Sequence, residues 1–167
     1  IRVTIVNDDI DENAVGSPTP EATETFTLDL ESATNATIDT SRDQVTFTIV
    51  DNDRAAITIT GPADADGTIN EATPPESTTY SVVLGSQPVG GDVSMTVVLT
   101  DTDGISTVNQ CTSTTTSLTF TEVNWKTAKT VTVVGTDDLY EDGNQCCRLV
   151  VTPDSTDALY NALAPVS

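Results

Sequence analysis

Closely spaced carboxylates are the residues of this chain with the clearest chemistry. Asp51 and Asp53 lie in a four-residue stretch, 51–54, that joins two strand-like patterns. The stretch is too short for a flexible linker, so it predicts a joint where one β-domain runs into the next. Asp8 and Asp9 form another acidic pair. Because Ca²⁺ takes about six to eight hard oxygen ligands, these four carboxylates predict a calcium site at the joint.

Asp137 and Asp138 form a further pair, again after a strand-like stretch, and predict a second cation site. The alternative for both groups is an acidic surface that is simply solvated, as in a salt-adapted protein. Residues 64–67, DADG, resemble part of an EF-type calcium loop. They are too short for a complete loop, so we interpret them as a plain turn.

Catalytic chemistry has little support in the composition. The chain has no histidine, which excludes Ser-His and Cys-His nucleophile pairs and imidazole metal ligands. Paired carboxylates also serve glycosidases, which need a cleft with sugar-stacking aromatic residues. Only one Trp, three Tyr and three Phe are present, and Trp125 fits a corner or core position better than a binding platform. We therefore do not expect an enzyme.

Charge restricts the partners of the chain. Its 167 residues include 26 acidic and 6 basic ones, which gives a net charge of −20. So few cations exclude nucleic acid and an anionic membrane surface as partners. No transmembrane run or signal peptide is recognisable, so membrane insertion is not expected. Self-repulsion of this size would destabilise a fold unless divalent cations or high salt neutralise it.

Alternating β patterns must position the carboxylates. We predict strands at residues 2–6, 24–30, 45–50, 57–60, 78–84, 93–100, 117–121, 130–134 and 146–152. No window has a helical period, and the tail at 153–167 reads as a loop with Tyr160 as a core anchor. The strand spacing predicts an all-β fold of immunoglobulin-like antiparallel β-sandwich type.

An internal repeat suggests the domain organisation. RVTIVNDDIDE near the start matches TVTVVGTDDLYED near the end, and ETFTLDL matches QCCRLVV. Residues 1–53 then hold only the later strands of a first sandwich, and residues 54–167 hold a second sandwich without its closing strand. We expect both units to be incomplete at the chain ends. Neighbouring repeats, or strand donation by another copy, would supply the missing strands.

Three cysteines, Cys111, Cys146 and Cys147, predict one disulfide and one leftover thiol in an oxidising compartment. Three reduced thiols in a cytosolic protein are the alternative. The repeat places Cys147 on the inward face of its strand and Cys146 on the outward face. On that basis we predict the pair Cys111–Cys146, with Cys147 as a thiol in the core.

With these motifs in view, the chain resembles tandem Calx-beta repeats. The resemblance rests on a strand followed by an Asp-Asp pair and a later carboxylate, an ETFTLDL strand, and a strand that ends in DND. Ser155, Asp157 and Tyr160 resemble the variant in large microbial surface and adhesin arrays. The resemblance implies a seven-stranded sandwich with calcium bound by loop carboxylates at one end.

The resemblance also implies two ligand sets, each of which the family would complete with residues outside this chain. In the first unit they are Asp8, Asp9, Glu12, Asp51 and Asp53. In the second unit they are Glu71, Asp101 or Asp103, Asp137, Asp138 and Glu141. An inserted loop at residues 13–20 departs from the family pattern.

The leading expectation is a structural repeat of an extracellular or cell-surface fibre, stalk or adhesin. Calcium would rigidify its joints, and its partners would be adjacent repeats or other copies of the chain. The alternatives are a calcium-sensing regulatory module and a ligand-binding adhesion domain. A disulfide at Cys111 would argue against the sensor, which belongs in a reducing compartment.

Overall fold

The computed structural model describes residues 2–12, 15, 23–62, 69, 75–101, 110–139 and 147–167. No helix in these ranges is long and apolar enough to cross a membrane. The elements are β1 (Thr23–Asp29), β2 (Gln44–Val50), β3 (Ile57–Thr60), β4 (Ser77–Leu84), β5 (Val93–Asp101), β6 (Cys111–Ser113), β7 (Ser117–Phe120), β8 (Lys129–Gly135), β9 (Cys147–Ser155) and α1 (Ala158–Asn161).

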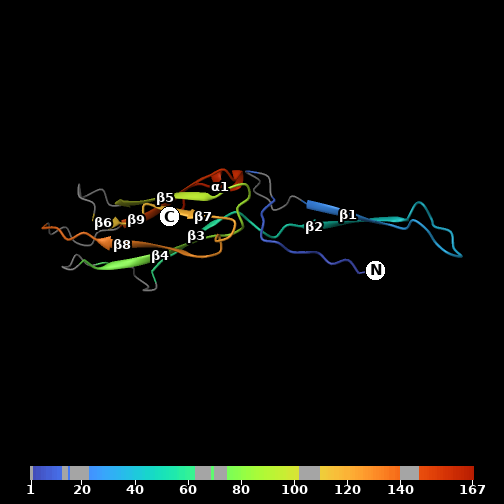
Figure 1. Cartoon of the computed structure of the whole chain (residues 1–167), viewed down its shortest axis with the longest axis horizontal. Helices are drawn as coiled ribbons and strands as arrows, with labels where there is room; N and C mark the ends of the chain where they lie inside the picture. Colours follow the sequence, from blue (N-terminus) through green and yellow to red (C-terminus); the bar gives the residue numbers. More distant parts are fainter. Residues whose placement is uncertain are drawn as a thin grey trace.

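The described residues form three antiparallel sheets. Strands β3-β4-β8-β6 form one sheet and β7-β5-β9 form another, and these two pack face to face as a sandwich (Figure 1). Strands β1 and β2 form a separate two-stranded ribbon. The prediction of an all-β fold is therefore confirmed.

The core lies between the two larger sheets, and strand alternation explains its composition. In β5, Val93, Met95 and Val97 are buried while the residues between them are exposed. Phe120 of β7 and Tyr160 of α1 are also almost completely buried. Tyr160 is thus a core residue, as predicted.

The ribbon has one apolar face that the described part of the chain leaves open. Phe26 and Phe47 are partners in the β1–β2 register, and their rings stack with centroids 4.9 Å apart. Leu28 and Val45 are the next pair on the same face. Phe47 remains 43% exposed, and among the described residues the buried core cluster begins only at Ala55.

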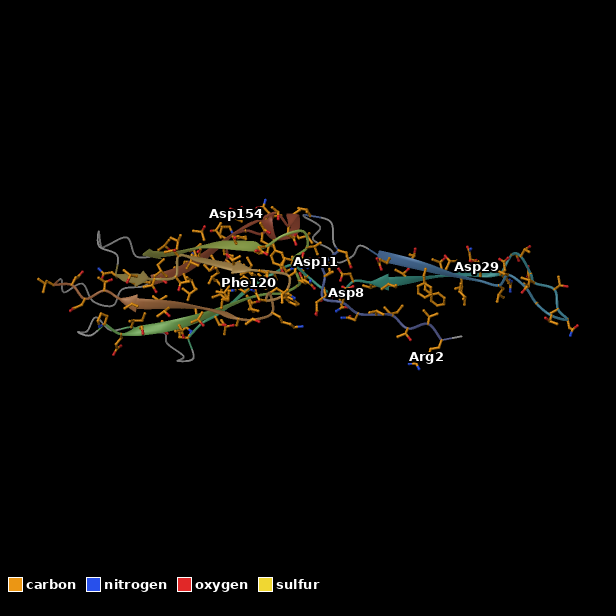
Figure 2. The ribbon with its side chains drawn as sticks, in the orientation of Figure 1. Arg2, Asp8, Asp11, Asp29, Phe120 and Asp154 are labelled. Atoms are coloured by element: carbon orange, nitrogen blue, oxygen red, sulfur yellow. A yellow bond between two sulfur atoms is a disulfide. The ribbon has the colours of Figure 1, made fainter. Side chains whose placement is uncertain are left out.

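The ribbon extends from one end of the sandwich, which makes the molecule elongated (Figure 1). Figure 2 shows Asp8 and Asp11 where the two parts meet, Asp29 far along the ribbon and Phe120 within the sandwich. The arrangement places the predicted joint carboxylates at the narrow connection between the two bodies.

Three secondary-structure predictions were wrong. Residues 2–6 alternate like a strand but are exposed and belong to no strand. Strand β6 was not among the predicted strands; only three of its residues pair with β8, which is too few to give an alternating pattern. The tail is not all loop, since β9 continues to Ser155 and one helical turn, α1, follows. The remaining described strands lie close to their predicted ranges.

The predicted disulfide also needs correction, because Cys111 pairs with Cys147 and not with Cys146. Cys147 begins β9 on the same side as the buried Leu149 and Val151, and Cys111 is itself buried. Both sulfur atoms therefore face the space between the sheets, and their bond joins β6 of one sheet to β9 of the other. The inward position of Cys147, which suggested a core thiol, is what makes it the partner.

Candidate functional site at the acidic joint

Two segments, residues 8–12 and 51–56, form the connection between ribbon and sandwich, and we call them the joint. The second segment links the end of β2 at Val50 to the start of β3 at Ile57. The first runs past it and reaches the turn at residues 85–92 between β4 and β5. Segments far apart in sequence therefore meet here, as the acidic motifs predict.

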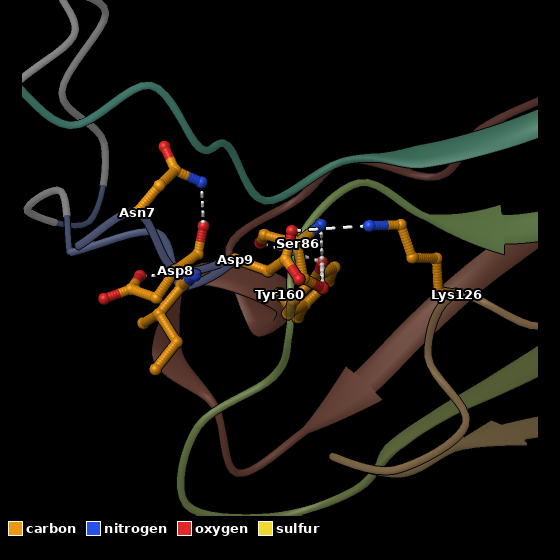
Figure 3. Close-up of polar contacts among 7 residues, drawn as sticks. Asn7, Asp8, Asp9, Ser86, Lys126 and Tyr160 are labelled. Carbon is orange, nitrogen blue, oxygen red and sulfur yellow. Dashed lines mark hydrogen bonds and ion pairs between the residues drawn. The ribbon is translucent and has the colours of Figure 1, made fainter.

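Asp8 and Asp9 order the first segment in different ways. A carboxylate oxygen of Asp8 accepts a hydrogen bond from the Ile10 amide at 3.1 Å, which forms a local turn. The Asp9 carbonyl accepts a hydrogen bond from the Gln87 amide at 2.7 Å. Its carboxylate lies 3.4 Å from the Lys126 ammonium (Figure 3). Both side chains of this ion pair are well exposed, so the pair adds little stability.

Asp11 is the most buried carboxylate of the joint, with 8% of its surface exposed. One of its oxygens accepts a hydrogen bond from the Ala55 amide at 2.5 Å, across 44 positions of sequence. Hydrogen bonds to an ionised carboxylate are roughly twice as strong as neutral ones. Asp11 therefore ties the first segment directly to the residue where the core begins.

Asp51 connects the two segments in the opposite direction. One carboxylate oxygen accepts a hydrogen bond from the Glu12 amide at 3.2 Å, and the other accepts one from the Asp53 amide at 2.8 Å. Asp51 and Asp11 thus each bind a backbone N–H of the other segment. The two segments are held together by reciprocal contacts.

The remaining joint carboxylates lie in a repulsive field. The pKa of Glu12 is raised by burial first, and then by the negative charges of Asp8 and Asp51. The pKa of Asp53 is also raised, by burial and then by Asp51, Asp9 and Asp8. The predicted group of carboxylates therefore lies close enough to interact electrostatically.

Proximity does not amount to a chelating site. In the described ranges, no three Asp, Glu, Cys or His side chains converge so that they could hold a metal ion. Oxygens of Asp8, Asp11 and Asp51 instead accept hydrogen bonds from backbone amides. The residues present do not fit a calcium cage.

Only some residues of the second predicted ligand group lie in the described part of the chain. Glu71, Asp103 and Glu141 lie outside the described residues. Asp101 ends β5, while Asp137 and Asp138 follow β8. Asp101 is paired with Cys147, and the end of β8 is paired with Cys111, so the disulfide lies where these strands end. The prediction of a cation site there remains a prediction.

Sequence reasoning missed Asp11, Gln87 and Lys126. A signal for Asp11 was present, because the internal repeat aligns it with Tyr140, while Asp8, Asp9 and Glu12 each align with a carboxylate. A departure from a repeat at one position marks a local role. Gln87 and Lys126 had no such signal, because Gln87 acts through its backbone and Lys126 through an exposed contact.

The turn at 85–92, which receives the first segment, is itself anchored. Asp157 accepts a hydrogen bond from the Val89 amide at 2.7 Å and also caps α1 through the amide of Leu159. The Tyr160 hydroxyl contacts Ser86 (Figure 3). Ser155 completes the motif by accepting a hydrogen bond from the Asp157 amide. The motif that resembled an adhesin variant thus supports the joint from the sandwich side.

Comparisons with known proteins give no relative. No protein-family model matches the chain, and no curated protein or solved structure matches it either. A function must therefore be argued from the residues and geometry described above.

Proposed function

We propose that this chain is a structural repeat of an extracellular fibre, stalk or adhesin, of immunoglobulin-like and Calx-beta-like type. The observation that carries the proposal is the joint, where the ribbon and the sandwich meet end to end without a flexible linker between them. Hydrogen bonds from Asp11 and Asp51 hold it on both sides. A disulfide across the sheets suits an oxidising, extracellular setting.

The open apolar face of the ribbon supports an arrangement in which a neighbouring repeat or another copy of the chain covers it. The internal repeat matches β1 to β9, and the inward residues of β9, Leu149 and Val151, are buried in the core cluster with residues of both large sheets. In the ribbon the matching face carries Phe26 and Phe47, and the described residues leave it open. Isolated two-stranded ribbons are marginally stable in water, so this face gains most from a neighbour.

Calcium is a subsidiary part of the proposal, and its support is electrostatic. Burial is the largest cause of the raised pKa values of Glu12 and Asp53, and the next is repulsion by neighbouring carboxylates, which a divalent cation would relieve. Because the described carboxylates do not form a cage, the proposed role is neutralisation of the joint surface. A calcium sensor in a reducing compartment is less well supported, because a disulfide links the sheets.

Small-angle X-ray scattering over a concentration series tests the structural role. We expect elongated particles that lengthen with concentration while their cross-section stays constant. Phe47→Thr should abolish the lengthening. Val98→Thr, which removes an apolar side chain of similar exposure (45% against 43% for Phe47) from β5 of the sandwich, should leave it intact. Particles that keep one length at all concentrations would contradict assembly through the ribbon.

Thermal melts in calcium, magnesium and sodium chloride test the cation. A rise in Tm with calcium at about 10⁻³ M, the range of weak extracellular modules, would support neutralisation by calcium. If sodium chloride at matched ionic strength raises Tm as much, the joint is an acidic, salt-adapted surface without a calcium role.

A further inference from the structure

We infer that the joint is locked by the protein's own hydrogen bonds, from backbone amides to carboxylates and to backbone carbonyls across it, so that its geometry needs no bound cation. The expectation from sequence was the reverse, with calcium as the locking element. This inference concerns the isolated chain and does not rest on the proposed role in a fibre.

The first lock is Asp11 on Ala55. The carboxylate is buried, and the Ala55 amide that it binds belongs to a buried residue at the entrance to β3. Breaking this contact would leave a charged group and an N–H donor without each other in a poorly solvated place. Such losses cost more than the contact contributes when formed, because the desolvation of both groups remains.

The second lock is Asp51 on Glu12, which closes the same two segments from the other side. Asp51 uses its second oxygen on the Asp53 amide, so both oxygens of this side chain are engaged. A cation could recruit Asp51 only by competing with these amides. Two reciprocal contacts between the same segments remove rotation that a single contact would permit.

The third lock joins the first segment to the sandwich through backbone atoms alone. The Gln87 amide donates to the Asp9 carbonyl at 2.7 Å, and Ile10 and Gln87 form a parallel β-bridge. Beside it, the Gly85 amide donates to the Ala56 carbonyl at 2.8 Å. A Cβ at Gly85 would lie 2.8 Å from the Arg54 carbonyl oxygen, so the turn packs tightly on the second segment.

These three locks account for a fixed joint in spite of its charge. Ca²⁺ needs about six to eight oxygen ligands, and the described carboxylates do not converge on one point. Asp11 and Asp51 are acceptors of amide hydrogen bonds instead. Glu12 and Asp53 remain as the repelled charges that general screening by salt would relieve.

Amide hydrogen exchange followed by NMR tests the inference in calcium-free buffer with EDTA. We expect the Ala55 and Gln87 amides to be protected in EDTA, with little change when calcium is added. Asp11→Ala should lower protection of the Ala55 amide by about tenfold or more. Asp154→Ala, which removes an equal charge from an exposed position on β9, should not change it.

The Val166 amide reports whether the sandwich of each variant remains folded, because it donates to the Val151 carbonyl far along the chain from the joint. If Asp11→Ala unfolds the sandwich, Asp51→Ala with the Glu12 amide as reporter provides the same test. Protection of the Ala55 amide that appears only with calcium would overturn the inference. So would protection that survives both variants. The scattering series tests assembly through the ribbon face, whereas hydrogen exchange tests the locks. Failure of the proposed function is therefore distinguishable from failure of this inference.

Discussion

The hydroxyl of Tyr160 donates a hydrogen bond to the carbonyl of Ser86, 74 positions earlier in the chain, at 2.6 Å. The same hydroxyl accepts a hydrogen bond from the Ser86 amide at 3.1 Å. One side-chain oxygen therefore satisfies both backbone groups of a residue in the buried part of the β4–β5 turn. Burial, which is the largest influence, raises the pKa of Tyr160.

Tyr160→Phe should destabilise the fold by about 1–3 kcal/mol, because it leaves the amide and carbonyl of Ser86 without their partner in a dry place. Urea unfolding followed by fluorescence of Trp125 measures the change. Tyr80→Phe, at a half-buried position on β4, is the matched control and should cost less. Equal losses in the two variants would show that the contact with Ser86 is not special.

Asp157→Ala should cost about 1–3 kcal/mol, because it removes the cap of α1 and the acceptor for the Val89 amide at once. Denaturant midpoints measure the loss. Asp154→Ala removes the same charge from an exposed site and should change stability by no more than about 0.5 kcal/mol. The prediction fails if the two variants have the same midpoint.

Cys147→Ser should destabilise the chain by about 3–4 kcal/mol, because the disulfide closes a loop with a sequence separation of 36. Cys146→Ser should keep the bridge and almost all of the stability. Mass spectrometry of peptides from the oxidised protein identifies the pair, and unfolding under oxidising conditions gives the cost. A bridge retained by Cys147→Ser and lost in Cys146→Ser would reverse the assignment.

Glu12→Gln and Asp53→Asn should raise Tm near pH 7. Both carboxyls have a pKa raised above the ordinary values of 4.5 and 3.8, so the folded state binds more protons than the unfolded state just above those values. Stability contributed by these groups therefore falls as pH rises through the folded pKa. Melts across pH should show the gain of each variant disappearing below the ordinary pKa, where both states are protonated.

The matched control for that pH series is Asp39→Asn. Asp39 accepts hydrogen bonds from Ser41, which lower its pKa, so the sign is opposite. Its charge stabilises the fold above the unfolded pKa, and this contribution is lost as pH falls through the folded pKa. A gain in Tm for Asp39→Asn near pH 7 would contradict this assignment.

Sequence alone predicted the strands whose side chains alternate strongly. In β1 and β2, the alternation of Phe26 and Phe47 with threonines marked both strands, and the structure shows that these two residues face each other across the ribbon. The sequence pattern failed where a neighbouring strand, and not the alternation of side chains, determines whether a segment forms a strand. Residues 2–6 alternate equally well, but they pair with no strand in the described part of the chain and form none themselves. The three residues of β6 and the single turn of α1 are too short to produce a period.

The candidate site was predicted in part for the same reason. The close spacing of the carboxylates in the sequence identified Asp8, Asp9, Asp51 and Asp53. It also indicated that the segments carrying them meet at the joint. It could not show which oxygens already serve backbone amides, because Asp11 reaches Ala55 across 44 positions and only through the tertiary fold. The internal repeat placed Cys147 inward correctly, but the pairing depended on the inward position of Cys111 on a strand that was not predicted.

The Cys111–Cys147 bridge also determines how far the chain can be stretched. A pulling force that passes along the backbone reaches one sulfur and leaves by the other, so the loop between them carries no load. With a separation of 36 residues, about 120 Å of contour length stays inextensible for as long as the bridge is intact. Under oxidising conditions the unfolded sandwich would therefore extend about 120 Å less than after reduction, which would release this length.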